Sequence, residues 1–297
     1  MYTTHFGLRE LPFGITPDTS YFHPCPSSQR ALNTLLVAAN SGEGFIKITG
    51  EVGTGKTLLC RKFMSVLDPS FVTAYIPNPL LQPRGLMSAL AEELRVPVSR
   101  DLDEFQILKA INYRLLMLAR DGKRVLLCID EAQAMPIETL EAVRLLTNLE
   151  TEKRKLLQIV LFGQPELDRK LEDESIRQLR QRITFQYCLG FLDRAEAALY
   201  VRHRLQVAGV EDALFSPGAL AALHAASRGV PRLLNILAHK SLMAAFGERR
   251  KMVDPSHVRA AAGDTPTALQ KFQPPWAWLS VAVFVTGVVS VVWMVIE

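Results

Sequence analysis

The segment GEVGTGKT, which runs from Gly50 to Thr57, constrains this chain more than any other. It matches the spacing G-x-x-x-x-G-K-[ST], with Gly50, Gly55, Lys56 and Thr57 at the four defined positions. The glycines allow a tight turn in which successive backbone N–H groups point into one concavity, a shape that suits phosphate oxygens. The apolar run FIKIT precedes the segment, and the amphipathic run KTLLCRKFMSVL overlaps its end. The pattern therefore predicts a strand, a phosphate-binding loop and a helix, in that order.

This loop predicts that the chain binds ATP together with Mg²⁺. The amine of Lys56 would reach the β- and γ-phosphates, and the hydroxyl of Thr57 would ligate Mg²⁺. The helix that follows adds the partial positive charge of its N-terminus. An ordinary glycine turn is the alternative, and the strand and helix on either side of the loop argue against it. The expected nucleotide contacts are Gly50, Glu51, Val52, Gly53, Thr54, Gly55, Lys56, Thr57 and Leu58.

Five short β-rich runs and the helical segments between them predict an α/β fold. Continuous apolar runs of this kind are typical of a parallel sheet that is covered on both faces. The expected strands are residues 45–50, 71–77, 125–132, 156–164 and 183–190. Residues 136–150 show apolar side chains at every third position, which predicts a helix packed through one face. Strands that alternate with helices favour an α/β domain over residues 1–190.

After Gly190 the strand pattern stops and helical patterns continue. Ser216 before Pro217 is an N-cap followed by proline at the first helical position. These patterns predict a small all-α domain over residues 191–265, followed by a proline-containing linker over residues 266–275. The expected helices of this domain are residues 193–209, 216–227, 230–247 and 255–262.

Residues 276–296 read WAWLSVAVFVTGVVSVVWMVI and contain no charged side chain. A helix of this length spans the ~30 Å hydrocarbon layer of a membrane. Trp276 and Trp293 lie near its two ends, as interfacial anchors do. Basic residues such as Arg259 and Lys271 precede the segment, which predicts that the body of the protein faces the cytoplasm. The expected location is therefore a membrane, crossed once.

Two further predicted strands end in polar side chains. The run VLLCIDEAQ delivers Asp130 and Glu131 to the C-terminal edge of the sheet, where ligands of such sheets bind. Asp130 would hold Mg²⁺, and Glu131 would act as the general base on the attacking water. The run VLFGQPELD ends its strand at Gln164, which would orient that water or sense the γ-phosphate. The alternatives are a solvated turn for the two carboxylates and a polar strand cap for Gln164.

Arginines in two motifs are candidates for contact with the phosphates. IRQLRQRI holds Arg180 and Arg182, either of which could reach a neighbouring subunit's γ-phosphate as an arginine finger. A solvated helix, paired with the acidic segment LEDES before it, is the alternative. RGVPRLLN places Arg232 in the first turn of a helix of the all-α domain, from which it could close onto the nucleotide. A surface arginine is the alternative there.

The order of these motifs resembles the AAA+ ATPases, and more narrowly the general secretion pathway protein A group. YTTHFGLRELPFGITPDTSYF is similar to that group's N-terminal signature, and LLTNLETEKRKLLQIVLFGQPEL is similar to its central block. The resemblance covers roughly residues 1–265. It implies a P-loop NTPase AAA+ core with a parallel sheet and a C-terminal helical lid, with Phe13 covering the adenine. It also implies a homo-oligomer at the bacterial inner membrane, associated with type IV (MSHA-like) pilus or type II secretion assembly proteins.

Two other classes of function stay open on the sequence alone. A DNA-associated AAA+ ATPase of the transposition-helper type would share this core. The net charge of +4 neither requires nor excludes binding to nucleic acid. The apolar segment at residues 276–296 argues against this DNA-associated class. A nucleotide-switched scaffold with incidental hydrolysis is the other. Four cysteines with no close pair predict neither a zinc knuckle nor a CxxC redox site.

Overall fold

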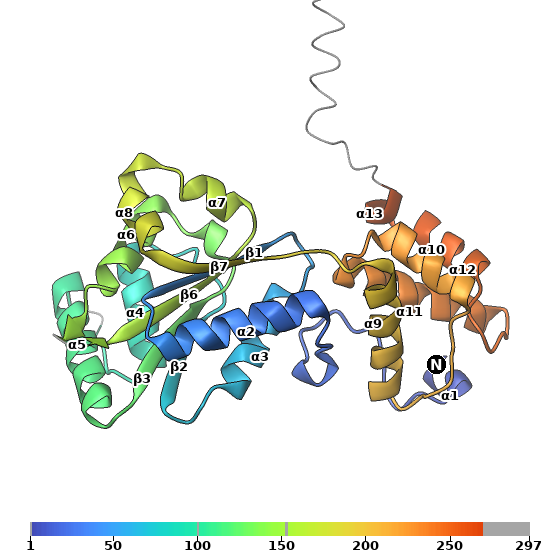
Figure 1. The fold of residues 1–297 in the computed structure, drawn as a ribbon, viewed down its shortest axis with the longest axis horizontal. Coiled ribbons are helices and arrows are strands. Elements are labelled where there is room, and N and C mark those ends of the chain that lie inside the picture. Colours follow the sequence, from blue (N-terminus) through green and yellow to red (C-terminus); the bar gives the residue numbers. More distant parts are fainter. Residues whose placement is uncertain (1, 100, 152–153, 270–297) are drawn as a thin grey trace, which may run out of the picture.

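The computed structural model describes residues 2–99, 101–151 and 154–269. Figure 1 shows two bodies side by side, an α/β domain and a helical domain. The polypeptide passes from the first to the second after the last strand of the sheet. The α/β core and the helical C-terminal region confirm the two predicted classes of structure.

A five-stranded parallel sheet forms the centre of the α/β domain, in the order β2-β3-β6-β1-β7. All five predicted strands are present, and each has boundaries within three residues of the prediction. Because the strands are parallel, their carboxyl ends meet at one edge of the sheet. The strands are β1 (Phe45–Gly50), β2 (Phe71–Ile76), β3 (Arg124–Ile129), β6 (Leu157–Gly163) and β7 (Ile183–Leu189).

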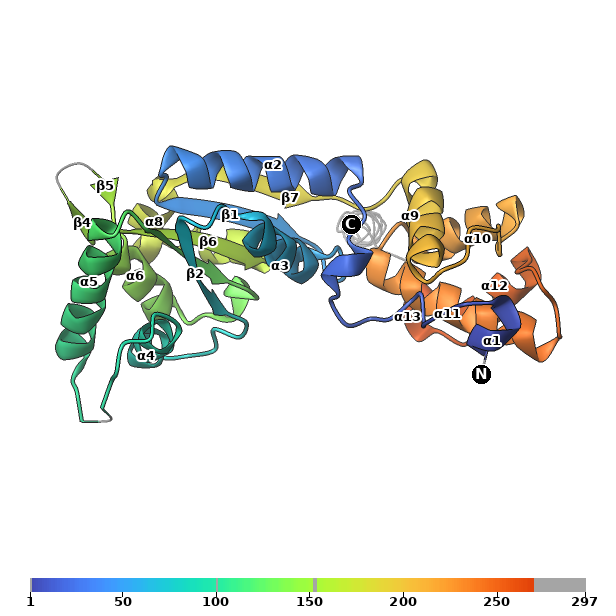
Figure 2. The same ribbon diagram turned by 90° about the horizontal axis from the view of Figure 1, so that it is seen from below.

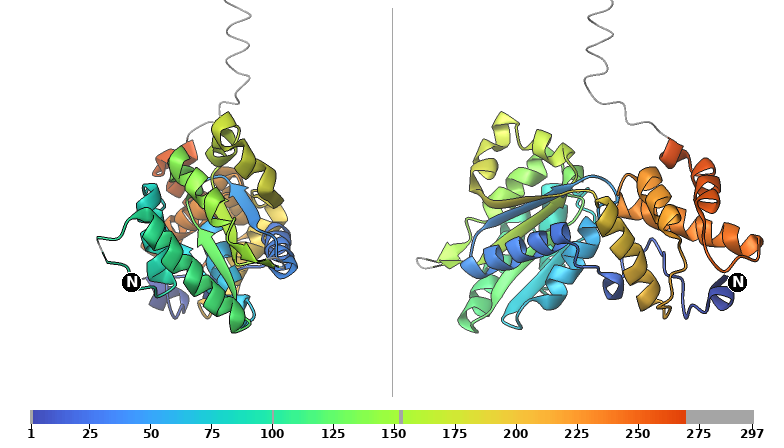
Figure 3. Two further views of the ribbon diagram at one scale, coloured as in Figure 1. Left: turned by 90° about the vertical axis from the view of Figure 1, so that its left-hand side faces the viewer. Right: turned by 45° about the vertical axis from the view of Figure 1, so that its right-hand side comes forward.

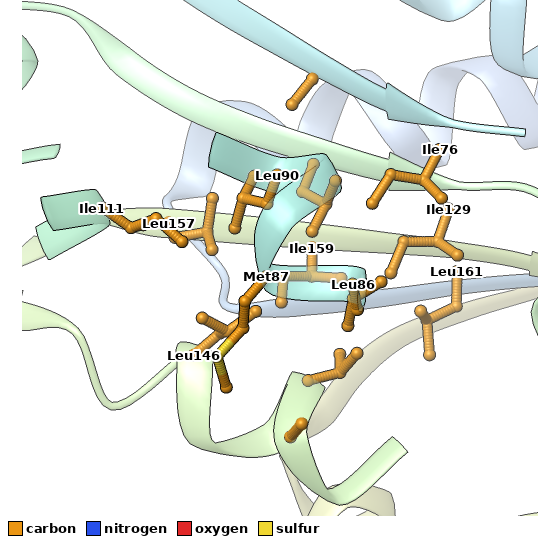
Figure 4. Packing of buried hydrophobic residues seen from close by; sticks show 14 of the residues in the cluster. Ile76, Leu86, Met87, Leu90, Ile111, Ile129, Leu146, Leu157, Ile159 and Leu161 are labelled. Atoms are coloured by element: carbon orange, nitrogen blue, oxygen red, sulfur yellow. The ribbon is translucent and has the colours of Figure 1, made fainter. Parts of the chain in front are cut away.

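Helices cover both faces of this sheet, as the continuous apolar strands require. One face packs on α2 and α3, and Figure 2 shows α2 running alongside β7. The other face packs on the remaining α-helices of the domain, and Figure 4 shows Leu86 and Leu90 of α4 over the strand residue Ile159. These helices are α2 (Pro26–Ser41), α3 (Lys56–Val66), α4 (Pro83–Glu93), α5 (Glu104–Arg120), α6 (Ile137–Leu146) and α8 (Arg177–Arg182).

Short elements connect these layers. α6 ends at Leu146, earlier than the helix predicted over residues 136–150, because a turn begins at Thr147, whose hydroxyl donates to the carbonyl of Arg144. The short elements are η1 (Thr19–Tyr21), η2 (Ala132–Ala134), β4 (Glu150–Thr151), β5 (Arg154–Lys155), α7 (Glu166–Lys170) and η3 (Glu174–Ile176).

The helical domain consists of α9 (Arg194–Val207), α10 (Pro217–Ser227), α11 (Pro231–Gly247) and α12 (Pro255–Gly263), close to the predicted ranges. The predicted cap is present, since Ser216 accepts a hydrogen bond from the N–H of Ala219. The first residues of the predicted linker depart from the prediction. They form a short helix, α13 (Pro266–Leu269), and Thr265 just before it is buried and bonded to the carbonyl of Ala261.

Residues 2–13 of the N-terminal segment pack on the helical domain. The segment begins with α1 (Tyr2–Phe6), and Figure 3 shows that this end of the chain lies against the helical domain. Phe6, Leu8 and Phe13 are buried in the same apolar cluster as the cores of α9 and α11. The sequence places this segment in the α/β unit over residues 1–190, and the structure instead shows its apolar side chains in the core of the second domain.

The predicted membrane-spanning segment, residues 276–296, and linker residues 270–275 lie outside the described residues. Within the described ranges, every helix is too short or too polar to cross a bilayer.

Candidate functional site

The loop between β1 and α3 has the shape that its glycines predict. Gly53 and Gly55 adopt φ angles of +82° and +96°, which are strained for any residue with a side chain. At Gly50 a Cβ would come within 2.9 Å of the Thr54 hydroxyl and 3.0 Å of Leu189, so only glycine fits there. The first residue of α3, Lys56, lies within this turn and is 5% exposed. The loop therefore forms a cradle with one buried amine.

Backbone carbonyls hold the amine of Lys56. Nζ donates to the carbonyl of Gly50 at 2.7 Å and to that of Glu51 at 3.0 Å. Burial lowers the pKa of Lys56, and nearby Glu131 and Asp130 oppose that shift. A cation that has only carbonyl dipoles for hydrogen bonds is incompletely compensated, so an anion in the cradle would stabilise it.

The two residues expected to hold the metal lie in contact. The hydroxyl of Thr57 donates to Oδ2 of Asp130 at 2.6 Å, and the hydroxyl of Tyr75 donates to the same oxygen at 3.3 Å. Burial raises the pKa of Asp130, which is 2% exposed. A hydroxyl and a carboxylate beside a phosphate cradle are the hard oxygen ligands that Mg²⁺ prefers, with water in its other positions. The donor set therefore fits Mg²⁺.

Glu131 is held by two glutamine side chains. Its backbone adopts φ +52°, in the left-handed region, directly after β3. Nε2 of Gln164 donates to Oε2 of Glu131 at 3.0 Å, and Nε2 of Gln133 donates to the same oxygen at 2.5 Å. The backbone N–H of Gln164 donates in turn to Oε1 of Gln133 at 2.9 Å. The structure thus brings together Glu131 and Gln164, both of which the sequence singles out, and adds Gln133, which it does not.

A cavity of about 220 Å³ lies between the two domains, beside the phosphate-binding loop. The loop residues from Val52 to Leu59, with Glu131 and Gln164, form one part of its wall. Residues 14–18 of the N-terminal segment form another part, and the helical domain closes the cavity. From the helical domain the lining residues are Leu192, Tyr200, Arg204, Pro231, Arg232 and Asn235.

The helical domain touches the loop through the start of α11. The N–H of Arg232 donates to the carbonyl of Gly53 at 3.1 Å, and a Cβ at Gly53 would lie 2.8 Å from the Cβ of Arg232. Gly229, at φ +74°, leaves the chain room to turn there, because a Cβ would lie 2.0 Å from the carbonyl oxygen of Leu192. The structure places Arg232 at the cavity, where the sequence expects it.

Phe13 does not reach this cavity, so the expectation that it covers the adenine is corrected. It is 3% exposed and packs edge-on against Phe215, with the ring centroids 6.0 Å apart. The nearby residues that do line the cavity are Ile15, Phe22 and His23. Phe13 instead fixes the segment that carries them to the core of the helical domain.

The two arginines of α8 lie in different surroundings, and neither lines the cavity. Nη1 of Arg182 donates to the hydroxyl of Thr147 at 2.8 Å and to the carbonyl of Arg144 at 3.3 Å, so it ties α8 to the end of α6. Arg180 is exposed. Arg182 is therefore held within its own subunit, in contrast to the free side chain that a finger requires.

Arg204 is a cavity residue that the sequence reasoning missed. It is 5% exposed, and its guanidinium donates to the carbonyls of Pro12 and Gly14 and to the hydroxyl of Tyr200. The ring of Tyr21 lies under it, 4.5 Å from the guanidinium carbon. The carbonyls that it binds, those of Pro12 and Gly14, are far away along the chain, so a helical arginine in RAEAALYVRHRLQV gave no signal.

Comparison with known proteins agrees with this geometry. Residues 39–171 match the family model described as "AAA domain". General secretion pathway protein A of Aeromonas hydrophila is 42% identical over 262 residues, which are 88% of this chain. The match covers 48% of that relative, so the chain spans about half of its length.

Solved structures of low sequence identity share the fold. Cdc6p from Pyrobaculum aerophilum matches with a TM-score of 0.65 at 20% identity, over 83% of this chain and 71% of that one. The Aeropyrum pernix ORC2 protein, solved as ADPNP-ADP complexes, gives 0.62 at 18%, over 84% and 69%. The Thermotoga maritima RuvB branch migration motor gives 0.56 at 17%, over 83% and 72%. These likenesses concern the arrangement of the sheet and helices.

Proposed function

We propose that this chain carries an AAA domain on the P-loop NTPase fold and hydrolyses ATP to ADP and phosphate. The observation that carries the proposal is the convergence of Thr57, Asp130 and Glu131 at the phosphate cradle. A site that only binds nucleotide needs the cradle. It does not need a second carboxylate whose backbone is strained and whose side chain is held at the cavity wall.

The residues take separate roles in this reaction. Lys56 moves from its carbonyl partners to the β- and γ-phosphates, where its charge offsets theirs. Glu131 accepts the proton of the attacking water, and Gln164 orients Glu131 and that water. Arg232 approaches the phosphates from the helical domain. Thr57 and Asp130 would hold Mg²⁺, which would supply positive charge to offset that of the phosphates.

The wider role is proposed from similarity. The 42% identity to general secretion pathway protein A supports association with a type II secretion machine. The resemblance seen in the sequence supports, more narrowly, assembly of an MSHA (mannose-sensitive haemagglutinin) pilus. The uncharged segment at residues 276–296 supports single-pass anchoring in the inner membrane with the two domains in the cytoplasm. We propose a homo-oligomer, since an arginine finger supplied in trans requires a neighbouring subunit.

Two substitutions test hydrolysis in the full-length protein. Glu131→Gln keeps the cradle and Asp130, so we expect it to bind ATP with normal affinity and to release phosphate far more slowly. Lys56→Ala removes the one buried cation of the cradle, and we expect it to lose ATP binding while remaining folded. The measurements are phosphate release, nucleotide titration and circular dichroism. Wild-type turnover by Glu131→Gln would remove Glu131 from the mechanism, and very slow turnover by the unmodified chain would favour a nucleotide-switched scaffold.

A further inference from the structure

Gln133 joins the two side chains on which the proposed hydrolysis depends. It lies in the short turn η2, directly after the Asp130–Glu131 pair, and is half-buried. Its amide donates to Oε2 of Glu131, and its carbonyl oxygen accepts the backbone N–H of Gln164. Together with the bond from the Gln164 amide to Glu131, these contacts close a ring of three hydrogen bonds between the ends of β3 and β6.

The ring fixes which way the amide of Gln133 faces. Its Oε1 accepts an N–H that comes from the backbone and cannot change its polarity. The NH₂ group must therefore point toward Glu131, where it meets a carboxylate acceptor. The two hydrogen bonds of its side chain therefore hold the amide in this orientation.

Two donors on one oxygen define the plane of the Glu131 carboxylate. One donor alone, from Gln164, would leave the group free to turn about its last side-chain bond. Both donors converge on Oε2, and within the described part of the chain Oε1 has no hydrogen-bond partner. Since Glu131 lines the cavity, Oε1 is the oxygen that is left to accept a proton from water there.

We propose that Gln133 is a positioning residue for ATP hydrolysis, which holds Oε2 of Glu131 so that Oε1 faces the attacking water. The inference rests on the proposed function, because it assigns a purpose to Gln133 only if Glu131 is the general base. Gln133 itself touches neither nucleotide nor water in this role. It also makes the orientation of Glu131 depend on the position of the backbone after β6.

Gln133→Met tests this role, since it keeps the length of the side chain and removes both hydrogen bonds. Loss of an orienting hydrogen bond at a functional site typically costs roughly tenfold or more in activity, so we expect kcat for ATP hydrolysis to fall by at least that factor. The dissociation constant of ATP should stay unchanged, because the cradle is untouched. The matched control is Gln206→Met, an exposed glutamine on α9, which should keep wild-type kcat.

A purely structural tether gives a different pattern. It would lower the thermal midpoint of unfolding and would still slow the reaction when Glu131 is absent. We expect the Glu131→Gln, Gln133→Met double variant to match Glu131→Gln alone in single-turnover rate, because both changes act through one group. Gln133→Glu, which places a like charge against Glu131, should be at least as slow as Gln133→Met and should recover partly as the pH falls.

Two results would overturn the inference. One is wild-type kcat in Gln133→Met, or in Gln133→Asn if the methionine variant does not fold. The other is an added loss of rate in the double variant. If the unmodified chain binds ATP but shows no turnover, the proposed hydrolysis itself is wrong, and that outcome is separate because it is seen without any substitution at Gln133.

Discussion

Thr57 and Asp130 connect the helix after the phosphate loop to the end of β3 through one hydrogen bond, 2.6 Å from Oγ1 to Oδ2. The two residues are 73 positions apart in the chain, and the parallel order of β1, β6 and β3 brings their strand ends to one edge. A metal ion bound at this edge would have a hydroxyl and a carboxylate available side by side.

Thr57→Val therefore should separate metal binding from nucleotide binding. Valine keeps the shape of threonine and removes only the hydroxyl. We expect ATP affinity without Mg²⁺ to stay unchanged and the gain in affinity on adding Mg²⁺ to be lost. Titration of a fluorescent ATP analogue with and without EDTA measures both. A variant that still responds to Mg²⁺ as the wild type does would show that the hydroxyl is not a ligand.

Gly53→Ala tests the contact between the loop and the helical domain. An alanine there takes on left-handed backbone strain of about 1–2 kcal/mol, and its Cβ would also lie 2.8 Å from the Cβ of Arg232. Gly122→Ala is the matched control, because Gly122 has φ +74° and open space around its missing side chain. Both variants should lose stability to the backbone strain, Gly53→Ala more because of the added clash, and only Gly53→Ala should lose ATP turnover. Equal turnover in the two variants would contradict a role for this contact.

Local patterns predicted most of the fold. Gly50, Lys56 and Asp130 could be proposed as site residues because the loop spacing and the end of an apolar strand are readable in a short segment of the sequence. Phe13 and Arg204 were misjudged or missed because their contacts are made across the chain, to Phe215 and to Pro12. Nothing in the pattern of an aromatic N-terminal segment tells whether its rings face a nucleotide or a second domain's core.

Gln133 shows a different limit. It belongs to the run VLLCIDEAQ that revealed the two carboxylates, yet a glutamine in a polar turn has many equivalent explanations. Its purpose depends on the backbone N–H of Gln164, which follows a different strand. That contact is made between strand ends, which spacing along one segment does not encode.

Arg204→Met tests the attachment of the N-terminal segment. Methionine keeps the length of the side chain and leaves the carbonyls of Pro12 and Gly14 without this donor. Each such loss costs about 1–3 kcal/mol when the group stays buried, so we expect a lower free energy of unfolding. ATP affinity should fall too, because residues 14–18 line the cavity. Arg202→Met, a change at an exposed neighbour on the same helix, is the control. Equal denaturation midpoints in the two variants would show that Arg204 does not stabilise the attachment of the N-terminal segment.

Acid should destabilise the helical domain and its N-terminal segment. Burial lowers the pKa of His23, His203 and His239. In the unfolded chain each histidine has its ordinary pKa of about 6.5. Below that pH the unfolded state therefore binds protons that the folded state does not bind. The free energy of unfolding is therefore highest above the unfolded pKa and falls as the pH drops through it toward the folded values.

His239→Gln isolates one of these groups. The hydroxyl of Tyr2 lies 2.8 Å from Nδ1 of His239, and a glutamine carbonyl could accept that bond without titrating. Urea denaturation at pH 7.5 and 5.5 should show a smaller loss of stability in the variant than in the wild type. Identical losses in the two proteins would mean that His239 is not among the groups responsible.

Arg180 and Arg182 lie two residues apart on α8, and the structure separates their roles. Arg182 is bonded to Thr147 and to the carbonyl of Arg144, so Arg182→Ala should lower the thermal midpoint of unfolding. Arg180 is exposed, and its helix α8 lies at the end of the α/β domain that is far from the helical domain (Figure 1). In the proposed homo-oligomer it is the arginine of the pair that is free to reach a neighbour.

Arg180→Ala should then bind ATP normally and hydrolyse it poorly, since an arginine finger is worth ~10³-fold or more in rate. Turnover per wild-type subunit should rise with protein concentration until the assembly saturates.

Mixing Arg180→Ala with Lys56→Ala should restore activity, because a Lys56→Ala subunit that cannot bind ATP still offers its arginine to an ATP-loaded neighbour. Arg182→Ala gives no such rescue if it acts only by holding α8 to α6. Rescue with Arg182→Ala and none with Arg180→Ala, in mixtures shown to co-assemble by crosslinking, would reverse the assignment. A finger at Arg182 would first have to break its two bonds to the end of α6, and the reversal would show that it does.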